Sequence, residues 1–141
     1  MRRPALRSGA AAPRQPFAEI EMARILAVDD SPSMRQLVKL TLVAGGHEVD
    51  LATDGVEALE VADRQRFDIV ITDVNMPNMD GITLVRELRQ RLAYKFVPLL
   101  MLTTEATVER RREGKAAGAT GWLVKPFDPG KLLATIDKVL P

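Results

Sequence analysis

The sequence contains no cysteine and one histidine, His47, among its 141 residues. The absence of cysteine excludes disulfides, thiolate zinc sites, iron–sulfur clusters and a cysteine nucleophile within this chain. One histidine is too few for a metal site that needs two from the same chain. Because His47 follows Gly45-Gly46, we expect it to be a surface loop residue. A chain without cysteine fits a cytoplasmic protein, which is the localisation we expect.

Long apolar runs and a strong excess of one charge are also missing. No apolar stretch approaches the roughly 18 residues of a membrane span, so we expect no membrane association. The formal net charge is +1. The arginine-rich stretch 1–21 has a net charge of +2, and the other 120 residues have a net charge of −1. The rest of the chain is nearly neutral, which argues against DNA binding. With 46% hydrophobic and 28% charged residues, the composition is typical of one globular domain.

Residues 1–21 differ from the rest of the chain. They are rich in Pro, Ala and Arg, and Pro4, Pro13 and Pro16 would interrupt a helix or a strand. No apolar segment of a secretory signal follows the arginines. We therefore expect 1–21 to be a disordered extension and 22–141 to be the domain. Translation that starts at Met22 is an alternative that the sequence leaves open.

Short apolar runs alternate with amphipathic segments throughout residues 22–141. The runs predict buried strands at 24–28, 48–52, 67–72, 97–102 and 121–124. The segments between and after them predict helices from Pro32 to the Gly45-Gly46 stop and at 55–64, 82–92, 108–117 and 130–140. Such alternation indicates βαβ units, so we expect a doubly wound α/β domain with a five-stranded parallel sheet. The strand at 48–52 mixes charged and apolar residues and is expected at an edge.

Polar side chains follow four of the predicted strands, at the edge where doubly wound folds bind ligands. They are Asp29, Asp30, Asp73, Thr103, Thr104 and Lys125. Two carboxylates about 4 Å apart repel each other by about 4 kcal/mol at an effective dielectric constant near 20, so a cation is required. Oxygen ligands favour Mg²⁺, with Mn²⁺ as a substitute. Lys125 would supply a further positive charge.

This combination of carboxylate, divalent cation, lysine and hydroxyl is typical of phosphoryl transfer. Aspartate is a competent nucleophile that forms an acyl phosphate, and Asp73 is our predicted nucleophile because it follows the central strand. Lys125 and Thr103 would contact phosphoryl oxygens. Thr104 would be a small neighbouring residue that leaves access to the phosphoryl group. Each residue alone has an ordinary structural explanation, and the prediction depends on their meeting at one edge.

The motifs that carry these residues resemble the receiver domain of bacterial two-component response regulators. They are Val28-Asp29-Asp30-Ser31, the stretch 73–81 from Asp73 to Gly81, Leu102-Thr103-Thr104-Glu105 and Lys125-Pro126-Phe127. The resemblance spans residues 23–140 in order, and the stretch 118–127 is most similar to the CheY-like chemotaxis regulators. It implies a flavodoxin-like three-layer sandwich with strand order 2-1-3-4-5. That order is the known one of CheY-like domains and is not independent of the resemblance.

The resemblance also implies roles for these residues. Asp73 is the phosphoacceptor for a phosphohistidine, and Mg²⁺ is bound by Asp73, Asp30, the backbone carbonyl of Asn75 and, through water, Asp29. Thr103 and Lys125 contact the acyl phosphate, beside Thr104. The Lys125–Pro126 bond is expected to be cis, which would aim the amine into the site.

Three further positions are implied to control timing and signalling. Asn75 and Glu105 lie two residues after Asp73 and Thr103, where they tune hydrolysis, and this pair points to fairly rapid self-dephosphorylation. The family's switch aromatic, often Tyr or Phe, is Trp122 here. Its ring is expected to turn inward when Thr103 moves toward the phosphate, provided that the space admits an indole.

We therefore expect a stand-alone, monomeric phosphoacceptor rather than an enzyme with an external substrate, although it supports its own phosphotransfer and autodephosphorylation. A CheA-like histidine kinase would phosphorylate it. It would then bind a flagellar motor switch protein or another target through the face formed by 108–117, 121–124 and 130–140, and a phosphatase is a further expected partner.

Other functions remain to be weighed against this one. A phosphorelay shuttle, passing phosphate to a His phosphotransfer domain, would use the same site. A dehalogenase-type phosphatase needs a second Asp where this chain has Asn75. A flavodoxin needs a phosphate-binding loop where Asp29-Asp30-Ser31-Pro32 would repel phosphate.

Overall fold

The computed structural model describes residues 22–105 and 107–141, so the expected extension 1–21 lies outside the described residues. Five parallel strands form one sheet in the order β2-β1-β3-β4-β5. Their bounds are β1 Arg24–Val28, β2 Glu48–Ala52, β3 Ile69–Thr72, β4 Leu99–Thr103 and β5 Gly121–Val124. The predicted doubly wound fold and its strand order are confirmed, and β2 lies at an edge as expected.

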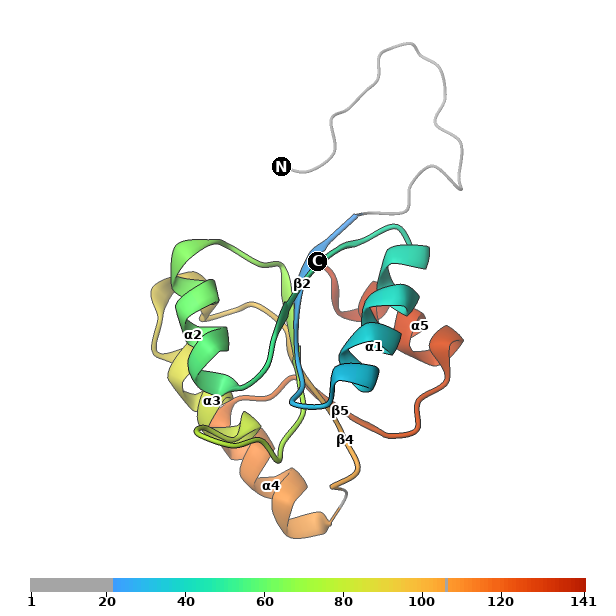
Figure 1. The fold of residues 1–141 in the computed structure, drawn as a ribbon. Coiled ribbons are helices and arrows are strands. Elements are labelled where there is room, and N and C mark those ends of the chain that lie inside the picture. Colours follow the sequence, from blue (N-terminus) through green and yellow to red (C-terminus); the bar gives the residue numbers. More distant parts are fainter. Residues whose placement is uncertain (1–21, 106) are drawn as a thin grey trace.

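Five α-helices cover the two faces of this sheet. They are α1 Pro32–Ala44, α2 Gly55–Arg64, α3 Gly81–Arg89, α4 Val108–Ala117 and α5 Pro129–Val139. Helices α1 and α5 lie on one face, and α2, α3 and α4 lie on the other (Figure 1). A side-chain oxygen accepts a backbone N–H bond at each helix start, from Ser31, Asp54, Asp80, Thr107 and Asp128. These caps fix where each chain segment turns from a strand into a helix.

The segment after α3 differs from its prediction. The helix expected to reach residue 92 ends at Arg89, and a 3₁₀ turn, η2 Leu92–Tyr94, follows. In this turn the ring of Tyr94 is buried, and its hydroxyl donates to Ala62 O at 3.0 Å and to Gln65 O at 2.9 Å. These contacts join the turn after α3 to the end of α2 and stabilise it.

The core has two layers, one on each side of the sheet. Leu26, Val70 and Met101 belong to the layer beneath α2, α3 and α4, whereas Ile25 and Ile71 belong to the layer beneath α1 and α5. Strands β1, β3 and β4 are almost fully buried on both faces. Their carboxyl ends are therefore held in fixed positions. No helix in the described part of the chain is long and apolar enough to cross a membrane.

His47 is buried, and the expectation that it lies at the surface is wrong. Its Nδ1 accepts a hydrogen bond from the backbone N–H of Ala23 at 3.0 Å. The register of β1 against β2 explains this, because it pairs Arg24 with Glu48 and places residue 47 beside residue 23. Burial lowers the pKa of His47, and the charge of Asp137 opposes that shift in part.

Candidate functional site

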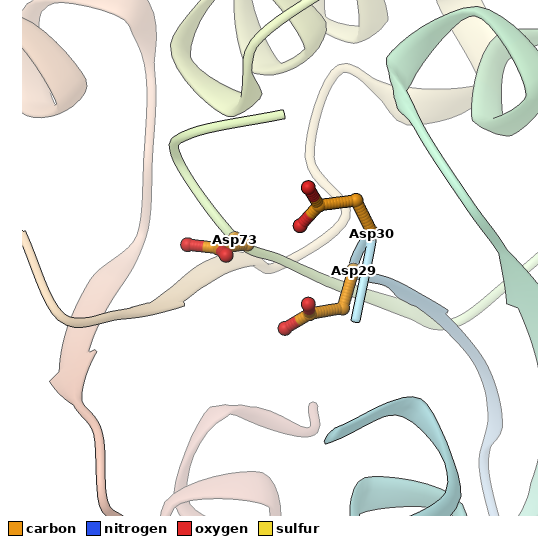
Figure 2. A group of neighbouring side chains, drawn as sticks. All are labelled: Asp29, Asp30 and Asp73. Carbon is orange, nitrogen blue, oxygen red and sulfur yellow. The ribbon is translucent and has the colours of Figure 1, made fainter. Parts of the chain in front are cut away.

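Three carboxylates meet at the carboxyl edge of the sheet. Asp29 and Asp30 follow β1, and Asp73 follows the neighbouring strand β3, whose Thr72 pairs with Val28. Each carboxylate offers an oxygen, and these three oxygens lie within 4.8 Å of one another. Figure 2 shows the three side chains extending to the same side of the strand ends. Asp29 and Asp73 are buried and Asp30 is exposed, so the cluster opens to solvent at Asp30.

Lys125 lies between the two buried carboxylates. Its Nζ donates to Asp29 Oδ2 at 2.7 Å and to Asp73 Oδ2 at 3.1 Å, and all three side chains are nearly buried. Burial alone would lower the pKa of Lys125, but the hydrogen bonds and the charges of Asp29 and Asp73 outweigh it and raise the pKa. Lys125 therefore stays protonated at neutral pH. The Lys125–Pro126 bond is cis, and the Lys125 N–H bonds to Thr103 O at 2.9 Å.

The other oxygen of each buried carboxylate is held by backbone. Asp29 Oδ1 accepts from the Ser31 N–H at 2.9 Å, and Asp73 Oδ1 accepts from the Val74 N–H at 2.7 Å. Gly81 closes the loop after Asp73, because its N–H bonds to Val74 O at 2.7 Å. A Cβ at Gly81 would overlap the backbone carbonyl of Asp73, so only glycine fits there. Both carboxylates are thus fixed in orientation before any ligand binds.

The cluster fits a divalent cation. Three carboxylates with one lysine leave net negative charge, and Lys125 bonds to Asp29 and Asp73 but not to Asp30 within the described residues. Carboxylate oxygens are the ligands that Mg²⁺ prefers. Asn75 follows Asp73 by two residues and is exposed on the same loop. The residues present can therefore hold Mg²⁺.

The end of β4 contributes the predicted hydroxyl. Thr103 is fully buried, and its Oγ1 accepts a hydrogen bond from the Glu105 N–H at 3.1 Å. Thr104 is exposed and Glu105 is half-buried. The structure therefore brings Thr103 to the same edge as Lys125, while its hydroxyl bonds to the β4–α4 loop.

Trp122 lies on β5 with its ring turned toward α4. Its Nε1 donates to the backbone carbonyl of Glu105 at 2.9 Å, and the half-buried ring packs against the core layer beneath α2, α3 and α4. The structure therefore has room for the indole. The expected inward turn of Trp122 on phosphorylation stays a prediction, because the structure shows one position of the ring.

One contact at the site is not predicted by the motifs. Arg35, on the first turn of α1, donates from Nη1 to the backbone carbonyl of Asp29 at 2.7 Å. The contact adds positive charge next to the acidic cluster. The only signal in the sequence is the helical position of Arg35 shortly after the Ser31 cap, which many surface arginines share.

The chain is similar to known proteins in family, sequence and structure. The model of the family "Response regulator receiver domain" matches residues 25–137. Response regulator MprA of Mycobacterium leprae is 44% identical over 117 residues, which cover 83% of this chain and 50% of that protein. The chain thus spans half the length of that relative. Chemotaxis protein CheY-3 of Vibrio cholerae is 41% identical over 117 residues, covering 82% of this chain and 90% of that protein.

Two solved structures are also similar. Chemotaxis protein CheY4 of Vibrio cholerae superimposes with a TM-score of 0.82 at 57% identity, covering 84% of this chain and 99% of that one. The receiver domain of the sensor histidine kinase PA1611 of Pseudomonas aeruginosa has a TM-score of 0.77 at 32% identity, covering 82% and 95%. That structure holds a magnesium ion coordinated in its active-site cleft.

Proposed function

Because the chain belongs to the response regulator receiver domain family, as a CheY-like receiver of a two-component system, we propose that Asp73 accepts a phosphoryl group from a histidine kinase. The observation that carries the proposal is the pairing of Asp73 with Lys125 beside Asp29 and Asp30. A nucleophilic carboxylate, a buried ammonium and a cluster of oxygen ligands then meet at one edge of the sheet.

The transfer follows from these positions. The Asp73 carboxylate attacks phosphorus, an O–P bond forms, and the P–N bond of the kinase phosphohistidine breaks with its electron pair returning to the imidazole. Asp73 is already oriented by the Val74 N–H. The Lys125 ammonium lies 3.1 Å from Asp73 Oδ2 and would follow the developing negative charge onto a phosphoryl oxygen. The Thr103 hydroxyl would donate to another.

The metal is part of this proposal. Asp29, Asp30 and Asp73, with the backbone carbonyl of Asn75, would hold Mg²⁺, or Mn²⁺ in its place. When bound, the ion neutralises charge on the phosphoryl oxygens. The charge of the acidic cluster supports this assignment, as does the magnesium in the related receiver domain of PA1611.

Loss of the phosphoryl group would occur at the same site. Asn75, which is exposed, and Glu105, which is half-buried, lie two residues after Asp73 and Thr103 and would tune the approach of water to the acyl phosphate. Thr104, which is small and exposed, would leave that approach open. The protein would thus support its own phosphotransfer and autodephosphorylation without being an enzyme for an external substrate.

The output we propose is phosphorylation-dependent protein binding in chemotaxis. The face formed by α4, β5 and α5 includes two exposed apolar residues, Val108 at the start of α4 and Val124 at the end of β5. The relatives CheY-3 and CheY4 of Vibrio cholerae are chemotaxis proteins, which supports a chemotaxis role. A CheA-like kinase, a flagellar motor switch protein and a phosphatase would be the partners of a monomeric cytoplasmic protein.

The first experiment measures intact mass after incubation with acetyl phosphate and Mg²⁺, with Asp73→Asn as the matched control. We expect one added phosphoryl group on the wild-type protein and none on the variant, which keeps the shape of the side chain but loses the nucleophile. Label on another residue of Asp73→Asn would contradict the assignment. Binding of the phosphorylated protein to a purified flagellar motor switch protein would then test the output.

A further inference from the structure

Helix α4 contains a glycine that its backbone does not require. Gly114 is buried inside α4, and the glycines with positive φ among the described residues are Gly46 and Gly118. Glycine in a helix interior is destabilising relative to alanine, because it adds conformational freedom to the unfolded chain. Another property of this position must therefore favour the absence of a side chain.

The space at Gly114 is taken by the indole of Trp122. A Cβ at residue 114 would lie 2.5 Å from Trp122 Cζ3 and 3.3 Å from Cε3. The shorter distance is well inside van der Waals contact. The ring cannot move aside cheaply, because its other end donates from Nε1 to Glu105 O at 2.9 Å. Trp122 is thus held between the helix backbone at Gly114 and the loop that precedes the helix.

The same loop is bonded to the predicted phosphate-binding hydroxyl. The Glu105 N–H donates to Thr103 Oγ1 at 3.1 Å, and the Glu105 carbonyl accepts from Trp122. A continuous set of contacts therefore runs from Thr103 through Glu105 and the indole to Gly114 on α4. Thr103 bonds to the N–H of Glu105, and Trp122 bonds to its carbonyl. The position of the indole therefore affects the position of the loop that bonds to Thr103.

We propose that Gly114 is a positioning residue that determines the inward position of Trp122, by leaving free the volume that the indole occupies. A side chain of one methyl group at residue 114 would displace the ring from α4 and break its bond to Glu105. The set of side-chain contacts from Thr103 to Gly114 would then be interrupted between Glu105 and Trp122. The consequence for signalling rests on the proposed receiver function, whereas the placement of the ring does not.

The test uses fluorescence, because Trp122 is the single tryptophan of the chain. Gly114→Ala is expected to shift the emission maximum to longer wavelength and to increase quenching by acrylamide, as the ring moves toward water. The control is Gly130→Ala in α5, where a Cβ would meet only Asp128 Oδ1 at 3.6 Å. That variant should leave the emission unchanged. Emission of Gly114→Ala identical to wild type would overturn the proposal.

Thermal unfolding supplies a second, independent readout. Replacing a glycine inside a helix by alanine, with no other effect, should raise the melting temperature by roughly 2–6 °C. We expect this rise when Gly114→Ala is added to a Trp122→Ala background, and a fall when it is added to the wild-type protein. Equal rises in both backgrounds would contradict the proposal, even if the emission had changed.

These measurements separate the inference from the proposed function. Both are made on unphosphorylated protein, and Gly114→Ala should still gain one phosphoryl group on Asp73 from acetyl phosphate. If wild type and variant both fail to gain it, the proposed function fails while the placement of Trp122 stands. If both gain it and the emission is unchanged, only the role of Gly114 is lost.

Discussion

Lys125 bonds to Asp29 and Asp73 at the same time, through Oδ2 of each carboxylate at 2.7 and 3.1 Å. One ammonium thus joins the ends of β1, β3 and β5. The consequence is that the proposed nucleophile is already paired with a cation before a phosphoryl donor arrives. In the proposed transfer, the Lys125 ammonium would exchange its hydrogen bond to Asp73 Oδ2 for one to a phosphoryl oxygen. This exchange would take place within the site.

This pairing predicts the behaviour of Lys125→Arg. The guanidinium keeps the charge but replaces a point donor with a planar fork, which does not fit between two carboxylates spaced for an ammonium. We expect the variant to accept phosphate, seen by intact mass, and to bind the target protein poorly. Normal target affinity of the phosphorylated variant would contradict this reasoning.

Asp30→Asn tests the metal site. Asp30 is exposed and is not paired with Lys125, so the variant should fold as the wild type does. Loss of a charged ligand should weaken Mg²⁺ binding at least about tenfold, by analogy with the cost of losing even an indirect metal contact. Calorimetric titration with Mg²⁺ measures this, and Glu109→Gln on α4 is the control. Equal affinities for the two variants would exclude Asp30 as a ligand.

The buried His47 predicts a pH dependence of stability. Its pKa is lowered on folding from 6.5, so the unfolded chain binds a proton that the folded chain excludes. The stability is full above pH 6.5 and falls as the pH drops toward the lower folded-state pKa, with a slope of at most about 1.4 kcal/mol per pH unit.

Urea unfolding of wild type and His47→Gln between pH 7.5 and 5.5 measures this effect. The glutamine amide can accept the Ala23 N–H bond but does not titrate. We expect the stability of wild type to fall more than that of the variant over this range. Parallel curves would show that His47 does not contribute.

Gly81→Ala tests the loop that carries Asp73. The added Cβ would overlap the backbone carbonyl of Asp73 and force the loop to move. We expect a loss of roughly 1–3 kcal/mol of unfolding free energy, typical of overpacking, together with slower phosphorylation by acetyl phosphate. Urea unfolding and time-resolved mass measurement check the two effects, with Gly130→Ala as control. Stability and phosphorylation rate both equal to wild type would show that the loop tolerates a side chain.

Local sequence patterns were sufficient for most of the fold. The bounds of β1, β2, β5, α2 and α4 match the apolar runs and caps that predict them. Strand β3 begins at Ile69 rather than 67, and just before it Asp68 accepts the Arg24 N–H through Oδ2 and donates its own N–H to Arg24 O. That contact joins residues 44 apart and leaves no local signal.

The site was predictable in its residues but not in its contacts. Parallel strands bring Asp29, Asp30, Asp73 and Lys125 to one edge whatever their exact geometry. The hydrogen bond of Thr103 to Glu105 and the fit of Trp122 against Gly114 depend on how α4 packs against the sheet. Burial of His47 likewise depends on the register of two strands rather than on its neighbours in sequence.

The two faces of the sheet have a consequence for recognition. Helix α4 covers one face and α5 the other, and the edge strand β5 lies between them (Figure 1). A protein that contacts both helices must span the thickness of the sheet and straddle its edge. It therefore senses how the two layers lie relative to each other, and a core substitution that slides one layer would alter recognition without changing a single contact residue.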